Sequence, residues 1–335
     1  MKKNFDIIFK VLRKEIKNMD ILKLNPIFKD YIWGGTRLRD DFGYESDLNP
    51  MAEGWVLACH KDGKNTVCNK EYCGKTLEEI INENGVEKTV GTNAAKFPYF
   101  PVLIKLIDAK DNLSIQVHPD NEYAERVEHE FGKTEVWYVL DAEPDATLVY
   151  GFKEKITSEE FKSAIENNTL TDVLNVVNVK KGDMFFIEAG TVHAIGKGTL
   201  IAEIQQNSNS TYRVYDYGRV GKDGKPRELH IKKAVDVSKT EPAKYDTKPF
   251  GKEEKIEGGT KQLLTECDLF TVYKYGIEKT IKLFADEKSF NHILVVDGSG
   301  KINNTPIKKG DSFYVPANFG EYKISGNCQV ILTKI

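Results

Sequence analysis

The chain has 335 residues, a formal net charge of −3, and ordinary fractions of apolar and aromatic residues for a globular protein. Its length exceeds the usual single-core domain, so we expect one large domain and a smaller one. The small net charge gives no electrostatic case for nucleic acid or an anionic membrane as partner, although local basic residues still suit a small anionic ligand.

The first nineteen residues carry an apolar stripe at helical spacing, with basic residues between its members. Lys10 and Arg13 interrupt any secretory h-region, and no apolar run in the chain approaches the length of a membrane span. An amphipathic helix for a membrane surface or a partner is one interpretation. The interpretation we favour is a dispensable extension over residues 1–19, with Met19 as the original start.

Five cysteines are scattered along the chain without any CxxC pair, so neither a zinc knuckle nor a disulfide framework is indicated. Cys68 and Cys73 could meet across a hairpin, but reduced thiols are the simpler interpretation. Together with the lack of a signal peptide, this predicts a cytoplasmic protein.

Short β-like runs separated by Gly, Asn and Asp turns dominate the chain after Asp20, which predicts a mainly β protein. Two segments read as helices, because each opens with a hydroxyl residue followed by an acidic first turn. These helices are residues 76–84 and 158–174; the clearest strands are residues 101–107, 136–140, 184–187, 200–205 and 211–217.

Four residues with metal-ligand side chains occur at strand-like positions. Gln116 and His118 are two residues apart, so on a strand both point to the same face. Glu135 and His193 follow on later β-like runs. An amide oxygen, two imidazoles and a carboxylate form a first shell for a divalent metal that leaves a position for water or substrate. The alternatives stay open at this point: His118 before a proline suits a turn, and His193 suits a satisfied core histidine.

Polar and aromatic residues alternate on two runs downstream of His193. Glu203 and Gln205 share one strand face, and Thr211, Arg213, Tyr215 and Tyr217 are expected to share another. A solvent-facing side of a sheet would explain this pattern. Beside two histidine-bearing strands, however, it favours the lining of a polar cavity.

The chain also contains an internal repeat, because residues 181–190 resemble residues 309–318, and residues 139–141 resemble residues 295–297. A strand that begins at Gly-Asp and ends in a turn is a unit of a jelly roll. Through these offsets His193 aligns with Glu321 and Glu135 with Asn291, so the second copy lacks the ligand set. The Lys-, Glu- and Pro-rich residues 238–259 are read as the boundary between the copies.

These observations predict three segments: the extension 1–19, a metal-binding domain over 20–240 with a helical insert near 155–178, and a small C-terminal β-domain over 241–335 without the metal site.

Four motifs in order resemble type I mannose-6-phosphate isomerases, most closely the short bacterial form. They are Ser-Ile-Gln-Val-His-Pro-Asp at 114–120, Gly-Lys-Thr-Glu at 132–135, Ala-Gly-Thr-Val-His-Ala-Ile-Gly-Lys-Gly at 189–198, and Glu-Ile-Gln-Gln-Asn-Ser with Thr-Tyr-Arg-Val-Tyr-Asp-Tyr at 203–217. Family-like features begin near residue 25 and reach the C-terminus, so the resemblance covers nearly the whole chain after the extension.

This resemblance implies a cupin-type jelly-roll barrel with a few helices and a smaller C-terminal β-barrel, one Zn²⁺ per chain, and a role in carbohydrate metabolism. It implies interconversion of mannose 6-phosphate and fructose 6-phosphate through a cis-enediol. The implied zinc ligands are Gln116, His118, Glu135 and His193. The implied catalytic residues are Arg213, Glu203 and Lys133, and the implied substrate-binding residues are Ser114 and Arg219.

Among these residues, the one that moves the proton is left open by the sequence. Glu203 is a carboxylate able to shuttle a proton, and Lys133 is a second candidate if its pKa is depressed. Arginine suits either the phosphate or a developing enediolate.

The sequence departs from the family's motifs at two positions, which limits the transfer of residue roles from the family to this chain. This chain has Lys-Thr-Glu where longer members commonly have Lys-Pro-Glu, and Asn209 stands where they have an acidic residue.

Two other classes use the same scaffold. An iron oxygenase would prefer two histidines and one carboxylate, against which Gln116 and the basic residues argue. A non-catalytic sugar-binding cupin would have broken ligand sets in both copies. The oligomeric state and the choice between zinc, cobalt and manganese are not determined by the sequence.

Overall fold

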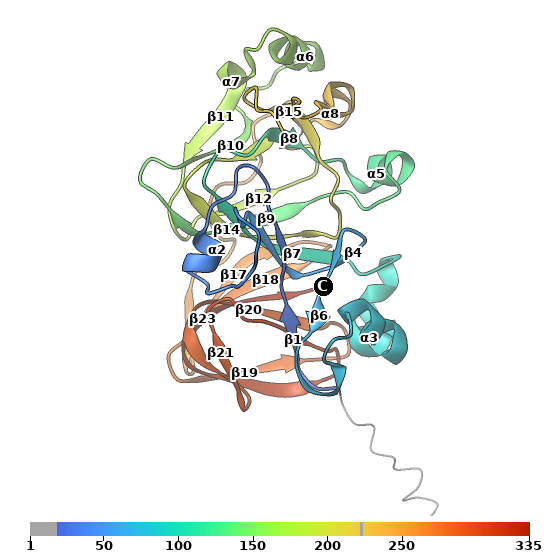
Figure 1. Cartoon of the computed structure of the whole chain (residues 1–335), viewed down its shortest axis with the longest axis vertical. Helices are drawn as coiled ribbons and strands as arrows, with labels where there is room; N and C mark the ends of the chain where they lie inside the picture. Colours follow the sequence, from blue (N-terminus) through green and yellow to red (C-terminus); the bar gives the residue numbers. More distant parts are fainter. Residues whose placement is uncertain (1–18, 222–223) are drawn as a thin grey trace, which may run out of the picture.

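The computed structural model describes residues 19–221 and 224–335. Two β-units lie one above the other along the long axis of the molecule, with the C-terminal strands at one end (Figure 1). The predicted extension lies outside the described residues, except for Met19, whose side chain is buried. Within the described ranges, no helix is long and apolar enough to cross a membrane.

The first β-unit is a jelly roll of two facing antiparallel sheets. The five-stranded sheet has the order β11-β10-β13-β8-β15, and the six-stranded sheet has the order β12-β9-β14-β7-β3-β2. The five-stranded sheet consists of β8 (Ile115–Val117), β10 (Thr147–Phe152), β11 (Leu174–Asn178), β13 (His193–Ile195) and β15 (Tyr212–Tyr215). The six-stranded sheet consists of β2 (Ile27–Lys29), β3 (Glu53–Leu57), β7 (Val102–Ala109), β9 (Glu135–Ala142), β12 (Met184–Ile187) and β14 (Thr199–Gln206). A separate hairpin joins β4 (Cys59–His60) to β5 (Gly63–Lys64).

The second β-unit is built on a ten-stranded sheet whose main path runs β16-β17-β18-β23-β20-β22-β1-β6, with β19 paired to β23 and β21 to β20. Its C-terminal members are β16 (Glu254–Ile256), β17 (Gly259–Glu266), β18 (Thr271–Ile277), β19 (Thr280–Ala285), β20 (Asn291–Ile302), β21 (Thr305–Lys308), β22 (Ser312–Val315) and β23 (Gly320–Lys334). With the jelly roll of the first unit, this mainly β architecture confirms the predicted fold class.

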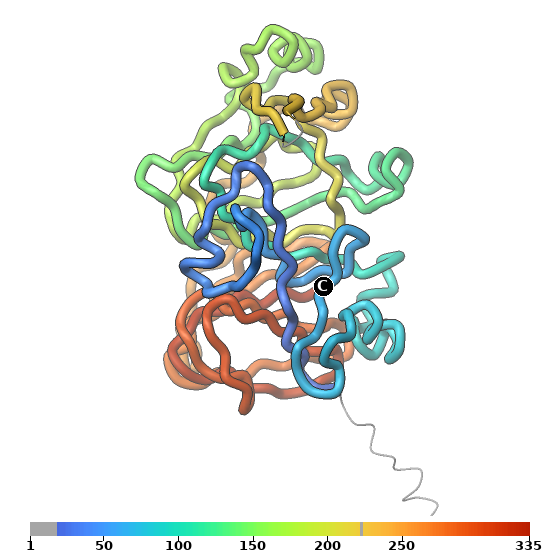
Figure 2. Tube along the Cα trace, viewed as in Figure 1, coloured from blue at the N-terminus to red at the C-terminus, as the bar shows by residue number. Residues whose placement is uncertain are grey.

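Two strands from the beginning of the chain complete that second sheet. β1 (Leu22–Asn25) pairs with β22, so that Leu22 lies opposite Tyr314, and β6 (Thr66–Val67) pairs with the other edge of β1. The blue N-terminal trace accordingly runs alongside the red C-terminal strands (Figure 2). Sheet membership therefore crosses residue 240, and the predicted division into 20–240 and 241–335 remains a prediction.

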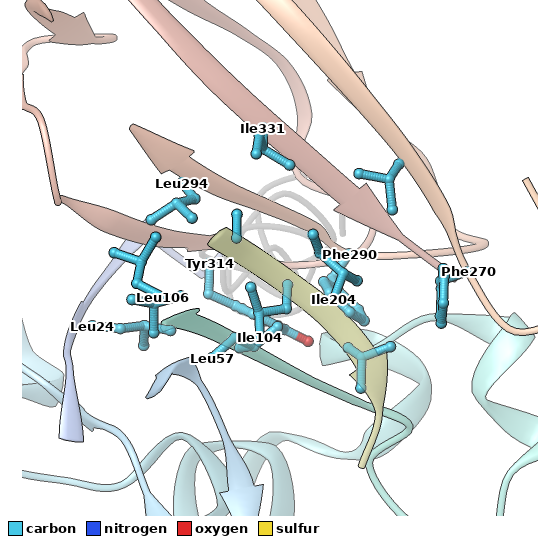
Figure 3. Packing of buried hydrophobic residues seen from close by; sticks show 14 of the residues in the cluster. Leu24, Leu57, Ile104, Leu106, Ile204, Phe270, Phe290, Leu294, Tyr314 and Ile331 are labelled. Carbon is cyan, nitrogen blue, oxygen red and sulfur yellow. The ribbon is translucent and has the colours of Figure 1, made fainter. Parts of the chain in front are cut away.

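The largest apolar cluster lies between the two β-units (Figure 3). From the first unit, β7 contributes Ile104 and Leu106 to it, and from the second unit β20 contributes Leu294. Because side chains alternate along a strand, Lys105 must then point to the opposite face, into the jelly roll. Every residue of β7 is buried, so this strand is covered on both faces. A lysine in the middle of such a strand needs a charged partner inside the barrel.

Short helices fill the connections: α2 (Arg37–Asp40), α3 (Leu77–Asn84), α4 (Val86–Thr89), α5 (Asn121–Val127), α6 (Ser158–Glu166), α7 (Leu170–Val173) and α8 (Ile231–Val237), with 3-10 turns η1 (Lys70–Tyr72) and η2 (Thr92–Lys96). Both predicted helices begin where expected, each with a capping box at its threonine N-cap, Thr76 and Thr157. The second, however, is two helices rather than one, because Asn168 adopts a positive φ of 57° between α6 and α7.

The internal repeat is confirmed at the level of strand register. In the first unit, Glu135 of β9 lies opposite Ile187 of β12; in the second, Asn291 of β20 lies opposite Val315 of β22. Both pairs carry the offsets expected from the sequence. In the second unit, Asn291 donates a hydrogen bond to the Tyr322 hydroxyl, and the surrounding cluster is otherwise mostly apolar.

A buried histidine makes the stability of the second unit sensitive to acid. His292 donates from Nε2 to Ser312 Oγ at 2.8 Å, and its Nδ1 has no hydrogen-bond partner among the described residues. Burial lowers the pKa of His292 to about 3. A depressed histidine pKa stabilises the fold above the unfolded pKa of about 6.5 and loses that contribution as pH falls toward 3.

We therefore expect the unfolding free energy to fall between pH 6 and pH 5 more steeply in the native protein than in His292→Gln, by about 1 kcal/mol per pH unit. Urea unfolding of both metal-free proteins at the two pH values measures this difference. Parallel pH dependences would contradict it.

Candidate metal centre

Three of the predicted site residues form a row across the five-stranded sheet. In its strand register, Gln116 of β8 lies opposite His193 of β13 on one side and opposite Arg213 of β15 on the other. Residues in cross-strand register share a face. His118 follows β8 by one residue and lies on the same side as Gln116, as their spacing predicts.

The facing six-stranded sheet supplies the carboxylates. Glu135 begins β9 and lies opposite Gln205 of β14, and Glu203 of β14 lies between Trp137 and Lys105 on the neighbouring strands. Alternation along β9 and β14 therefore turns these side chains to the inner face of the jelly roll.

The two sheets bring His118, Glu135 and His193 together. Their ligand atoms all lie within 4.8 Å of one another, and all three residues are buried. His193 Nε2 is 3.4 Å from Glu135 Oε1, and His118 Nε2 is 3.7 Å from Glu135 Oε2. Within the described part of the chain, this is the one group of three such residues with this geometry.

Backbone carbonyls fix the tautomers of both histidines. His118 Nδ1 donates to the Ser210 carbonyl at 2.8 Å, and His193 Nδ1 donates to the Thr191 carbonyl at 2.7 Å. In each ring Nε2 is then the unprotonated nitrogen that faces Glu135. Burial, followed by Lys133 and His193, lowers the pKa of His118 well below its usual range, and burial lowers the pKa of His193 to about 4. Both imidazoles are therefore neutral, as metal binding requires.

The cluster fits a divalent cation because two of its ligand atoms lack any hydrogen-bond partner among the described residues. Glu135 Oε1 and His193 Nε2 are buried without a hydrogen-bond partner among the described residues, whereas Glu135 Oε2 and His118 Nε2 are contacted by the Lys133 ammonium. Burial raises the pKa of Glu135 although the Lys133 ammonium beside it acts in the opposite direction, so a bound divalent cation would further favour the ionised carboxylate. Gln116 presents an amide oxygen beside His193, and Ser114 Oγ contacts that oxygen at 3.3 Å.

Lys133 lies directly against the cluster. Its Nζ is 3.0 Å from Glu135 Oε2 and 3.2 Å from His118 Nε2. The same ammonium is 4.0 Å from Glu203 Oε1. The structure thus places the two expected proton-transfer residues near each other and next to the proposed ligands.

A second buried charge network lies beside Lys133. Lys105 Nζ is 3.3 Å from Glu203 Oε1 and 3.7 Å from Glu53 Oε2, and indole N–H groups of Trp137 and Trp55 donate to Glu203 and Glu53. Burial alone would raise the pKa of Glu203, but Lys133 and Lys105 outweigh it and lower this pKa. Lys105 and Glu53 were not among the predicted site residues, although a lysine within the apolar run 101–107 indicates a charge inside a buried strand.

Basic residues border the other side of the row. Arg213 donates from Nε to Ser114 Oγ at 3.3 Å and from Nη1 to the Glu228 carbonyl at 2.9 Å. Arg219 pairs with Asp216, which also binds Arg227. The proposed substrate-binding pair Ser114 and Arg219 is therefore split: Ser114 contacts Arg213 and Gln116, whereas Arg219 is held by Asp216. Arg227 is a further basic residue for which no sequence motif gave a signal.

One expectation about the lining is wrong. Tyr217 does not continue the face of Arg213, because β15 ends at Tyr215 after a register shift and Tyr217 has a positive φ of 57°. A turn at Tyr217 and Gly218, closed by the hydrogen bond from the Arg219 N–H to the Asp216 carbonyl, replaces the longer strand.

The chain is similar in sequence and structure to known proteins. The model of the family "Phosphomannose isomerase type I, catalytic domain" matches residues 21–174, and that of "Mannose-6-phosphate isomerase, cupin domain" matches residues 260–335. A probable mannose-6-phosphate isomerase of Bacillus subtilis is 40% identical over 93% of this chain and 98% of its own. A mannose-6-phosphate isomerase of Streptococcus mutans is 36% identical over 90% of this chain and 93% of its own. The crystal structure of the mannose 6-phosphate isomerase from Bacillus subtilis matches with a TM-score of 0.86 and 38% identity, covering 95% of this chain and 100% of that one.

Proposed function

The chain belongs to the type I mannose-6-phosphate isomerase family and is an aldose–ketose isomerase, and from this premise we propose a zinc-dependent reaction through a cis-enediol. The proposed ligands of a single Zn²⁺ are Gln116, His118, Glu135 and His193. The observation that carries the metal proposal is the convergence of two imidazole Nε2 atoms and the Glu135 carboxylate on one buried point, where His193 Nε2 and Glu135 Oε1 have no hydrogen-bond partner among the described residues.

The reaction moves a carbonyl group between C1 and C2 of the sugar phosphate. A proton must leave the carbon beside the carbonyl, and a proton must return to the neighbouring carbon. When bound, the metal would act as a Lewis acid toward a sugar oxygen. The donor set of nitrogen and oxygen atoms suits zinc and equally admits cobalt or manganese.

Glu203 is the proposed proton carrier. Its Oε2 accepts a hydrogen bond from the Trp137 indole at 3.0 Å, and its Oε1, which lies 3.3 Å from Lys105 Nζ, is the oxygen proposed to take the substrate proton. Lys105 and Lys133 keep the Glu203 carboxylate ionised. These buried partners also fix its position relative to the substrate. Lys133 is the proposed partner that stabilises negative charge near Glu203 and the metal ligands.

Arg213 and Ser114 are proposed to face the substrate oxygens. Arg213 keeps a positive charge at the end of the ligand row, in register with Gln116, where it can stabilise an enediolate or hold the phosphate. Arg219 is proposed to add positive charge near the phosphate. A cytoplasmic location remains part of the proposal.

The cis-enediol step predicts exchange with solvent. Isomerisation of mannose 6-phosphate in D₂O is expected to place deuterium on C1 of fructose 6-phosphate, because a proton held by Glu203 can exchange before it returns. NMR of the product at low conversion measures this incorporation. The converse experiment uses mannose 6-phosphate that carries deuterium on C2. Complete transfer of that deuterium to C1 of the product, with no exchange with solvent, would point to a hydride shift and contradict the enediol.

A further inference from the structure

A largely buried carboxylate outside the proposed ligand set, that of Glu130, binds the turn between β14 and β15. Glu130 Oε2 accepts hydrogen bonds from three groups of this turn: Ser208 Oγ at 3.5 Å, the Asn209 backbone N–H at 3.4 Å and Ser210 Oγ at 3.1 Å. The Glu130 side chain is only 11% exposed. The Glu130 carboxylate thus binds both ends of the turn, Ser208 and Ser210.

The same turn contacts a proposed metal ligand. The backbone carbonyl of Ser210 accepts the Nδ1–H of His118 at 2.8 Å. That bond fixes both the orientation of the ring and the tautomer that leaves Nε2 free. A displacement of Ser210 would therefore move the acceptor on which His118 depends.

Glu130 is itself fixed from the opposite side by the β4–β5 hairpin. His60 Nε2 lies 3.7 Å from Glu130 Oε1, and Lys61 Nζ forms an ion pair with the same oxygen. His60 accepts the Asp62 N–H at Nδ1, so its proton is on Nε2 and faces Glu130. The carboxylate therefore bridges the hairpin and the turn.

We infer that Glu130 is a positioning residue for His118, acting through the Ser210 carbonyl. The inference rests on the proposed metal site and deepens it. Two contacts separate Glu130 from His118, and groups hydrogen-bonded beyond the direct ligands of a metal commonly set its affinity.

Glu130→Ala is expected to weaken zinc affinity by about 10- to 100-fold, the usual effect of losing a group that orients a metal ligand. Competition with a chromogenic chelator measures the dissociation constant without reference to isomerase activity. The visible spectrum of the cobalt-loaded protein gives a second readout, because it responds to the position of His118 in the ligand field. Glu130→Gln, which retains an acceptor oxygen for the turn, is expected to recover part of the affinity.

Two further variants separate positioning from general stability. Glu125→Ala removes an exposed carboxylate from the same segment and is expected to leave zinc affinity and the cobalt spectrum unchanged. Ser210→Ala removes the hydroxyl but keeps the carbonyl. Combined with Glu130→Ala, it is expected to have a less than additive effect, because both changes break one connection.

Native zinc affinity and an unchanged cobalt spectrum in Glu130→Ala would overturn the inference, even if the variant unfolds more easily. If Glu130→Ala does not fold, zinc affinity and the cobalt spectrum are compared among Glu130→Gln, Ser210→Ala and the native protein. Native values in both variants would then overturn the inference. A native protein that binds no divalent metal would overturn both the proposed zinc site and this inference. A native protein that binds zinc, with unchanged affinity in Glu130→Ala, would overturn this inference alone.

Discussion

Replacing His193 with alanine is expected to lower turnover by about 10³-fold, equivalent to roughly 4 kcal/mol of transition-state stabilisation. His193 is fully buried, and its Nε2 faces Glu135 at 3.4 Å without a hydrogen-bond partner among the described residues. Its removal takes one of the two neutral imidazoles from the proposed ligand set. We also expect zinc binding to weaken, which equilibrium dialysis and a steady-state assay measure together.

His129→Asn is the matched control for this variant. His129 is exposed and has a positive φ of 56°, which asparagine tolerates, so this change removes an imidazole without straining the backbone. It is expected to leave turnover and zinc binding unchanged. A His193→Ala protein that folds and keeps both native zinc content and native turnover would contradict the proposed role.

Arg213→Lys is expected to reduce kcat by about 10²- to 10³-fold, with a smaller change in KM. Burial, followed by the nearby Arg227, lowers the pKa of Arg213, but the guanidinium remains charged at neutral pH. Ser114 and the Glu228 carbonyl fix its plane beside Gln116. A lysine retains the charge but loses this fixed fork of donors, so charge that develops in the transition state is less well stabilised.

Arg126→Lys is the control, because Arg126 is an exposed arginine of α5 that packs over Tyr123. Steady-state kinetics separate the two possible contributions of Arg213. A raised KM with unchanged kcat in Arg213→Lys would mean that the side chain binds substrate and transition state equally. That result would contradict the transition-state role and leave only a role in holding the phosphate.

Local patterns were sufficient to predict several strands of the first unit, but pairing over long sequence distances was not predictable from them. The strand predicted at 184–187 is β12 without a change of bounds, because Gly-Asp and Ala-Gly turns flank an apolar run. Nothing in residues 22–25 indicates that β1 pairs with β22, nearly the whole chain away. Helix 158–174 was predicted too long, because the positive φ at Asn168 depends on its surroundings.

In the candidate site, too, contacts between distant segments could not be predicted from local patterns. The row of His193, Gln116 and Arg213 follows from strand spacing once the pairing of β13, β8 and β15 is known. Residue spacing predicted the members of this row but not the residues that contact them from other strands and loops. Lys105 could have been recognised as a charge in an apolar strand, whereas Glu130 belongs to an irregular segment and gains its contacts only from the folded turn.

The most direct test of the account is an assay of fructose 6-phosphate formation from mannose 6-phosphate, with the native protein, a chelated sample, and the chelated sample supplied with zinc. We expect activity in the native protein, loss of activity on chelation in proportion to the metal removed, and recovery of activity with zinc. Full activity in a sample shown by elemental analysis to be free of metal would contradict the proposed metal centre.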